Sequence, residues 1–253
     1  MSTLKSFLAP AARRVLHALN LDFVRSSKGV YVTSADEWQF AAFRRRAIFM
    51  KLGTRVLYDV GAQIGGWSQY LRNRGYMGAV VAFEPNPATF RILEANSRND
   101  SNWVNYNLAV GDVAGTARFN IAGNLGESSS LLAPHVSRIC VEKTVEVEVC
   151  TLAPYFEKHG VDGSFIKLDV QGFEERVLLG VGEALTHVSG VYLEAALEPD
   201  YQNSCMFDDL HAFMQRKNFA LVHTEPGYVD PATGYMREIN CMYVNKKLHS
   251  IHS

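Results

Sequence analysis

The chain has 253 residues, of which 47% are hydrophobic and 20% charged, and its formal net charge is −1. This composition indicates one globular domain rather than a disordered chain, and it excludes a global field that recruits nucleic acid or acidic lipid. The four cysteines form no Cys-x-x-Cys pair, so neither a zinc site nor a disulfide framework is indicated. No apolar run reaches transmembrane length, and we expect a reduced, cytoplasmic protein.

The beginning of the chain has the pattern of an amphipathic helix. Apolar residues recur at i, i+3, i+4 and i+7 spacing from Leu4 to Leu19, and Arg13 and Arg14 lie off that stripe. We expect this helix to pack on the domain or on the partner subunit of a homodimer. Peripheral contact with a membrane surface is the alternative.

A second helix is predicted before the main domain. Ser34 and Glu37 have the spacing of a capping box, and the helix that they open ends at Gly53. We therefore expect a helical extension over residues 1–53 and one main domain over residues 54–248.

The strand, turn and helix at residues 55–74 are the most informative part of the chain. A buried strand, Val56–Val60, carries Asp59 and leads into a turn that contains Gly61, Gly65 and Gly66. This order opens a nucleotide-binding βαβ unit, in which bare backbone and the first amides of the helix face the ligand.

The spacing in this turn favours one cofactor over another. The G-x-G-x-x-G pattern of dinucleotide sites is missing, and Asp59 stands two residues before the first glycine. That carboxylate would repel a diphosphate and attract a cation. S-adenosylmethionine (SAM) carries a sulfonium and an ammonium but no phosphate, so the turn favours SAM over NAD.

A second acidic residue follows the next predicted strand, which runs from Gly78 to Phe83. The carboxylate of Glu84 could accept both ribose hydroxyls of a nucleoside, and Pro85 biases Glu84 towards an extended conformation. Asn86 is predicted to cap the helix that begins at Pro87.

The third predicted strand, Trp103–Val110, ends at another acid, Asp112. An adenine amino group would need an acceptor at this edge of the sheet. The candidates are Asp112 or, through backbone and packing, Ala109 and Val110.

The alternation of predicted strands and helices stops over residues 113–149, which are predicted to be an insert of strands and loops. Gly115–Ile121 and Lys143–Val149 alternate polar and apolar residues, as half-exposed strands do. Between them, Gly123–Ser130 is rich in glycine and serine. We expect residues 125–137 to close over bound substrate as a lid.

Predicted helices and strands alternate again after the insert. Helices are predicted at Leu152–His159, Phe173–Thr186 and Phe207–Arg216, and strands at Phe165–Asp169, Gly190–Leu197, Phe219–Thr224 and Glu238–Asn245. The predicted fold is therefore α/β, with a Rossmann-like, seven-stranded, mostly parallel sheet.

In such a sheet, ligands bind at the carboxyl ends of the strands where the strand order reverses. That point lies between the first strand and Phe165–Asp169, so Asp169 is the first candidate for a general base or for orienting a hydroxyl. Lys167 faces the same side of the strand and could pair with Asp169. Glu194 and His135 are the alternatives. No histidine and acid cluster has metal-ligand spacing, so we predict no metal.

Four segments together resemble the FkbM-type family of SAM-dependent methyltransferases: Asp59–Ser68, Ala82–Pro87, Phe165–Glu174 and Tyr192–Glu194. The resemblance implies the Rossmann-like fold of class I SAM methyltransferases and O-methylation of a hydroxyl, typically on a sugar or polyketide. It assigns Asp59, Gly61 and Glu84 to the cofactor, and Lys167, Asp169, Gly172 and Glu174 to a second motif. Our full set of predicted cofactor contacts is Asp59, Gly61, Ala62, Gly65, Glu84, Pro85, Ala109 and Asp112.

Two positions depart from the family pattern. Gln171 stands where the family usually has glutamate, and Asn240 where relatives often have aspartate. The first departure weakens any mechanism that needs a carboxylate at that position, including metal binding.

The predicted function is that of a SAM-dependent O-methyltransferase that acts on a hydroxyl of a saccharide or glycolipid precursor. A SAM-binding protein without turnover is the alternative outside enzymes. An NAD(P)-linked oxidoreductase is the alternative within enzymes, and the missing G-x-G-x-x-G pattern argues against it.

Overall fold

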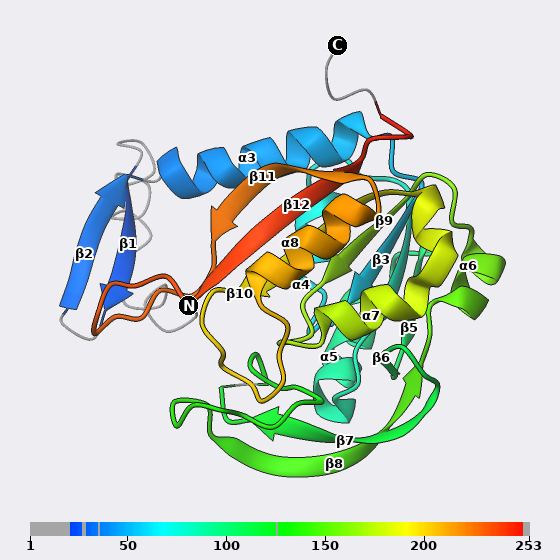
Figure 1. The fold of residues 1–253 in the computed structure, drawn as a ribbon. Coiled ribbons are helices and arrows are strands. Elements are labelled where there is room, and N and C mark those ends of the chain that lie inside the picture. Colours follow the sequence, from blue (N-terminus) through cyan, green and yellow to red (C-terminus); the bar gives the residue numbers. More distant parts are fainter. Residues whose placement is uncertain (1–20, 27–28, 35, 125, 250–253) are drawn as a thin grey trace.

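A computed structural model describes residues 21–26, 29–34, 36–124 and 126–249 (Figure 1). The amphipathic helix predicted for residues 4–19 lies outside these ranges, and so does Leu125 of the predicted lid. Within the described ranges, no helix is both long and apolar enough to cross a membrane.

The centre of the fold is a seven-stranded sheet with the order β11-β12-β10-β9-β3-β4-β5. β12 is antiparallel to both of its neighbours, and the other pairs are parallel. The predicted Rossmann-like, mostly parallel sheet is thereby confirmed. The strands are β3 (Val56–Val60), β4 (Ala79–Phe83), β5 (Trp103–Tyr106), β9 (Ser164–Leu168), β10 (Val188–Ala196), β11 (Phe219–Pro226) and β12 (Glu238–Asn245).

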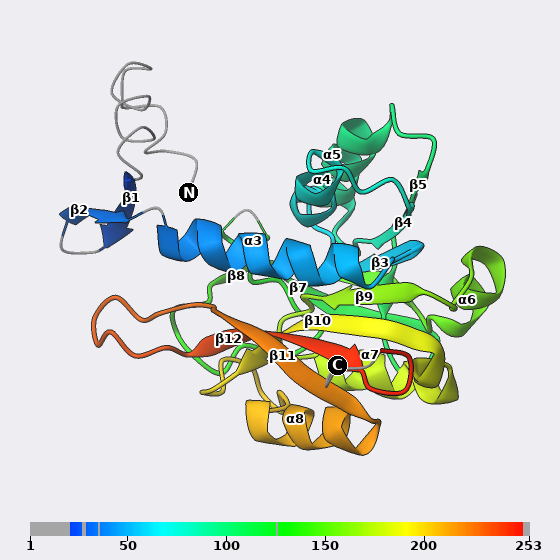
Figure 2. The same cartoon turned by 90° about the horizontal axis from the view of Figure 1, so that it is seen from above.

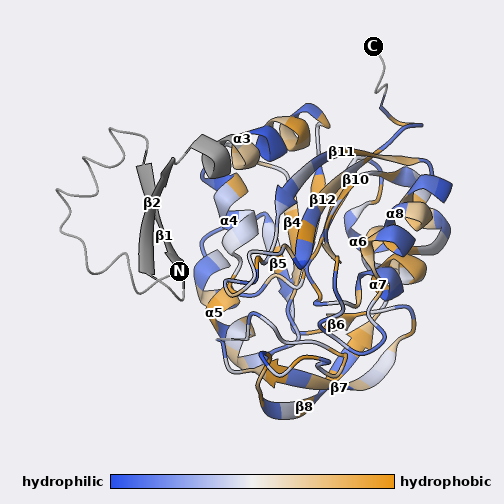
Figure 3. Ribbon diagram, turned by 60° about the vertical axis from the view of Figure 1, so that its left-hand side comes forward, coloured by the Kyte–Doolittle hydropathy of each residue, from blue (hydrophilic) through white to orange (hydrophobic). Residues whose placement is uncertain are grey.

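The two central strands are covered on both faces. Every residue of β3 and of β9 is buried, which is why both segments read as apolar runs rather than as alternating patterns. Figure 3 shows apolar residues along the strands of the central sheet and mixed apolar and hydrophilic residues along the helices.

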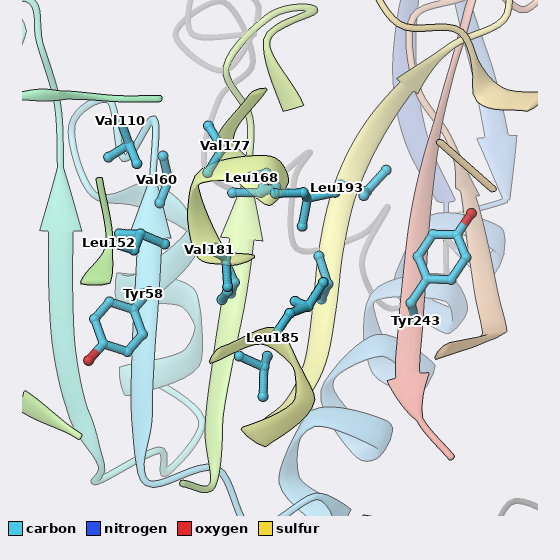
Figure 4. Packing of buried hydrophobic residues seen from close by; sticks show 14 of the residues in the cluster. Tyr58, Val60, Val110, Leu152, Leu168, Val177, Val181, Leu185, Leu193 and Tyr243 are labelled. Atoms are coloured by element: carbon cyan, nitrogen blue, oxygen red, sulfur yellow. The ribbon is translucent and has the colours of Figure 1, made fainter. Parts of the chain in front are cut away.

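Helices cover both faces of the sheet (Figure 2). One face packs on α3 (Asp36–Lys51), α4 (Gly66–Arg72) and α5 (Pro87–Ser97), and the other on α6 (Ala153–His159), α7 (Glu174–Val181) and α8 (Phe207–Arg216). Figure 4 shows the second core, in which Leu168 of β9 and Leu193 of β10 meet Val177 of α7.

Helix α3 is tightly joined to the sheet. Phe49 is fully buried, and its ring lies 5.1 Å from that of Phe165, edge to face. Arg45 donates to Glu225 of β11 at 2.6 Å. A separate hairpin precedes α3 and consists of β1 (Leu21–Ser26) and β2 (Gly29–Ser34).

The third predicted strand, Trp103–Val110, is two strands, so this prediction was wrong. β5 belongs to the central sheet, whereas β6 (Ala109–Val110) pairs with β8 (Val141–Cys150) in a second sheet of order β6-β8-β7. Asn107 lies at the break, where its amide donates to the carbonyl oxygens of Glu84 and Pro85 at 2.8 and 3.1 Å. These bonds turn the chain out of the central sheet.

The other strand of the second sheet is β7 (Gly115–Ala122), antiparallel to β8, so the predicted strands of the insert are present. The helix predicted to end at Thr186 stops earlier. α7 ends at Val181, and a 3-10 helix, η1 (Gly182–His187), follows it. Gly182 has φ of 60°, which no α-helix continues through.

Gly61 connects β3 to the glycine-rich turn where two backbones approach closely. Its φ is 70°, and a Cβ at this position would overlap the backbone oxygen of Asp169. The amides of Gly61 and Ala62 both donate to the carbonyl oxygen of Phe83, at 3.0 and 2.9 Å. The ends of β3, β4 and β9 are therefore fixed against one another.

We predict that Gly61→Ala lowers the free energy of unfolding by about 3 kcal/mol, because positive φ strain and overpacking add. Gly53→Ala is the matched control, since Gly53 has φ of 63° and open space around it. Its cost should be about 1 kcal/mol. Urea unfolding measures both, and equal losses would contradict the close approach.

Candidate active site

A cleft of about 930 Å³ opens at the carboxyl ends of β3, β4 and β9. The insert forms its opposite wall. The residues that line it include Gly61, Gln63, Glu84, Pro85, Ala109, Phe119, Ser128, Arg138, Asp169, Gln171, Glu194, Tyr228 and Glu238. The cleft therefore joins the predicted cofactor end of the sheet to a second group of acids.

Glu84 is held at the end of β4 by two backbone amides. Its Oε2 accepts from the amide of Gln63 at 2.8 Å, and its Oε1 accepts from that of Asn86 at 2.9 Å. Burial raises the pKa of Glu84 to about 7, although both amides favour the charged form. Each oxygen keeps a second lone pair, so the carboxylate can accept further hydrogen bonds from a ligand in the cleft.

The predicted cap of α5 is present and explains part of this geometry. Asn86 accepts from the amide of Ala88 at 3.1 Å, and Pro87 is the first helical residue. The sharp turn from β4 into α5 places the amide of Asn86 against Glu84.

Asp59 lies beneath the cleft and not on its surface. It is fully buried, and its carboxylate accepts from the hydroxyl of Ser68 at 2.5 Å. The ammonium of Lys167, its neighbour across β3 and β9, lies 3.2 Å from the other carboxylate oxygen. Lys167 also donates to the carbonyl oxygen of Gly61 at 2.7 Å.

Burial lowers the pKa of Lys167, but the carboxylates of Asp59 and Asp169 outweigh it and raise that pKa overall. Lys167 is therefore a buried cation. Its ammonium lies 3.6 Å from Asp169, which it joins to the same network as Asp59.

Three carboxyl groups meet at the other end of the cleft. The side chain of Asp169 is 47% exposed, and Glu194 and Glu238 reach the cleft from β10 and β12. Burial, and then the negative charges of Asp169 and Glu238, raise the pKa of Glu194 well above its usual range. Burial also raises the pKa of Glu238, although Arg138 opposes the shift.

The remaining predicted site residues lie elsewhere. Ala62 and Gly65 shape the turn without lining the cleft. Asp112 forms an ion pair with Arg176 at 2.9 Å beside a second, smaller pocket. His135 does not line the cleft, and its amide donates to the carbonyl oxygen of Asp200.

Sequence reasoning missed Arg138, Tyr228 and Glu238. Arg138 lies over the ring of Tyr228 at 4.1 Å. The fold of the insert brings Arg138 to the cleft, and the antiparallel pairing of β12 with β10 brings Glu238 there. Tyr228 comes from the connection between β11 and β12. In the part of the chain that the structure describes, no group of three or more His, Cys, Asp or Glu residues could hold a metal ion.

Residues 59–221 match the family described as the methyltransferase FkbM domain. Because this match spans more than half of the 253 residues, the chain belongs to the FkbM methyltransferase family, and the resemblance drawn from its motifs is confirmed.

Two curated methyltransferases are similar to the chain over part of their length. Hexuronic acid methyltransferase AglP of Haloferax volcanii is 28% identical over 148 residues, which cover 57% of this chain and 58% of that protein. Methyltransferase sdnD of Sordaria araneosa is 26% identical over 156 residues, 50% of this chain and 60% of that protein. The chain thus matches less than two thirds of each relative.

Solved structures show more distant likeness. The methyltransferase FkbM from Methylobacillus flagellatus matches with a TM-score of 0.48 and 16% identity, over 74% of this chain and 43% of that chain. The magnesium protoporphyrin IX methyltransferase from Synechocystis with bound SAH matches with a TM-score of 0.47 and 11% identity, over 96% and 98%.

We predict that Lys167→Met lowers the free energy of unfolding by about 3–5 kcal/mol, because it leaves the buried charge of Asp59 uncompensated. Adding Asp59→Asn should restore part of the loss. Lys217→Met is the matched control, since the partner of Lys217, Glu183, is 92% exposed, and its effect should stay within about 0.5 kcal/mol. Urea unfolding of the four proteins measures this, and equal losses in both lysine variants would contradict it.

Proposed function

We propose that this protein is a SAM-dependent O-methyltransferase that transfers a methyl group to a hydroxyl of a saccharide or glycolipid precursor. The observation that carries the proposal is the cleft itself. One of its ends holds Glu84 on two backbone amides, and its other end holds a group of carboxyls. Membership of the FkbM family supports methyl transfer, and the name of the relative AglP supports a saccharide acceptor.

The residues at the β4 end suit an adenosine-type ligand with a positive charge. The carboxylate of Glu84 would accept the two ribose hydroxyls, and the bare backbone at Gly61 allows a ligand to lie against the turn. Pro85 and Ala109 also line the cleft. The carboxyls further along the cleft complement a cation and would disfavour a diphosphate.

When bound, SAM supplies an activated methyl group, so the protein has to align the acceptor and remove one proton. We assign the removal of that proton to Asp169, whose carboxylate is accessible from the cleft. Lys167 holds Asp169 from below, and Glu194 is the alternative base. His135 receives no role, because it does not line the cleft.

We also propose a cytoplasmic location, which the four free thiols of the chain support. A small-molecule or glycan acceptor is the partner that this function requires.

Calorimetry with SAM and with NAD, followed by transfer of labelled methyl from SAM to a panel of glycans, tests the proposed function. We expect SAM to bind, NAD not to bind, and at least one glycan to become methylated. Asp169→Asn should keep SAM binding and lower kcat by about 10²–10⁴-fold, the usual contribution of a general base. Asp208→Asn, at an exposed position of α8, is the control.

SAM binding with no transfer to any acceptor would favour the binding protein without turnover. Binding of NAD in place of SAM would overturn the proposal and favour an oxidoreductase.

We predict that Glu84→Gln weakens SAM binding by about 10–100-fold, because charge-assisted hydrogen bonds to the ribose are lost. Since burial raises the pKa of Glu84 to about 7, the ionised form grows as the pH rises through 7, and wild-type affinity should rise with it. The variant should lose this pH dependence. Glu94→Gln, at an exposed position of α5, is the matched control, and calorimetry between pH values of about 6 and 8 is the measurement. A variant that keeps the wild-type slope would contradict the role of Glu84.

A further inference from the structure

Gln171 occupies an unusual backbone position between β9 and α7. Its φ is 54°, in the left-handed region that residues other than glycine rarely adopt. The hydroxyl of Ser130 donates to its carbonyl oxygen at 2.7 Å and holds this conformation. The side chain is thereby fixed in the cleft among the carboxyl groups.

The amide of Gln171 makes three hydrogen bonds. Its Nε2 lies 3.1 Å from Oδ1 of Asp169 and 2.7 Å from Oε2 of Glu194. Its Oε1 accepts from the hydroxyl of Tyr201 at 2.8 Å. An amide nitrogen only donates, so both carboxyl oxygens that face it act as acceptors and carry no proton.

We propose that Gln171 is a positioning residue that joins Asp169 and Glu194 into one unit and keeps the oxygens facing it unprotonated. A proton carried by Glu194 then lies on its other oxygen, away from Asp169, and Asp169 stays ready to accept the acceptor's hydroxyl proton. The catalytic part of this inference rests on the proposed function, whereas the protonation part stands on the hydrogen bonds alone.

The surroundings of Glu194 favour its protonated form, so the donors of Gln171 decide which of its oxygens carries the proton. Burial raises the pKa of Glu194 most, the neighbouring carboxylates raise it further, and the positive charge of Lys167 lowers it. Without the two donor hydrogens of Gln171, Glu194 would take a proton on either oxygen, including the one beside Asp169. The charged and titratable groups that face Glu194 are Lys167 of β9, Asp169 just after β9, Glu174 of α7 and Glu238 of β12. Tyr201 is reached through Gln171, and Arg138 through Glu238.

Tyr201 contacts both the amide of Gln171 and the backbone of the insert. Its hydroxyl oxygen lies 2.8 Å from Oε1 of Gln171 and 3.0 Å from the carbonyl oxygen of Ser128, and its single hydrogen serves one of these acceptors at a time. Rotating the amide would turn its oxygen towards Glu194, which could then bond only when protonated there. Tyr201 would donate to Ser128 instead. The orientation of Gln171 thus links the protonation of Glu194 to the anchoring of the insert at Ser128.

The test is a pH titration by NMR of protein labelled at the glutamate side-chain carboxyl carbons, with the Glu194 signal assigned by Glu194→Gln. In Gln171→Met, which keeps the length of the side chain and removes both donors, we expect the midpoint of Glu194 to rise by about one pH unit. Gln171→Glu, which adds a carboxyl, should raise it further. Gln215→Met, at an exposed position of α8, is the matched control and should match the wild type.

Tyr201→Phe provides a second test if Gln171→Met does not fold, because it leaves Gln171 in place and keeps the aromatic ring of residue 201. It should raise the midpoint in the same direction and by less. Coincident midpoints in wild type, Gln171→Met and Tyr201→Phe would overturn the proposal.

The catalytic part is tested on the acceptor that the wild type methylates. Gln171→Met should move the acid limb of the pH profile of kcat to higher pH, with the KM for SAM unchanged. An unmoved limb would overturn the catalytic role. A wild type that methylates no acceptor would instead count against the proposed function, while the titration would still decide the protonation of Glu194.

Discussion

The buried ion pair between Asp59 and Lys167 is the interaction on which the cleft depends. It joins the two central strands at their carboxyl ends, where Lys167 also bonds the carbonyl oxygen of Gly61. Asp59 in turn accepts from Ser68, at the start of the helix after the turn. The two charges compensate each other out of water, and the bonds from Ser68 to Asp59 and from Lys167 to Gly61 add to that compensation. The glycine-rich turn and Asp169 are thus set relative to each other from below.

The charges of the cleft above this pair follow one pattern. Glu84 at one end is offset by two amides, and Asp169 and Glu194 at the other end share the donors of Gln171. Arg138 is the cationic side chain among the residues that line the cleft, and the backbone amides and the amide of Gln171 offset part of the negative charge. The positive charge of the proposed sulfonium-bearing ligand would complement such a surface.

Much of this arrangement could be predicted from the sequence, because it is local. The fully buried strands Val56–Val60 and Ser164–Leu168 read as apolar runs, and Asn86 before Pro87 read as a helix cap. The break at Asn107 could not be predicted, since it depends on carbonyl oxygens more than twenty residues earlier. Glu238 and Arg138 were missed for the same reason: only the antiparallel register of the last strand and the fold of the insert bring them to the cleft.

Helix α3 packs on the central sheet and contributes to the core of the domain. The boundary predicted at residues 53 and 54 falls just after this helix, yet Phe49 fills a space against Phe165, and Arg45 neutralises Glu225 on the outermost strand. A shortened chain starting at residue 54 would expose the aromatic surface at Phe165 and leave Glu225 with His223 but without Arg45. Such a fragment would be prone to aggregate, so the smallest independently folding unit has to include α3.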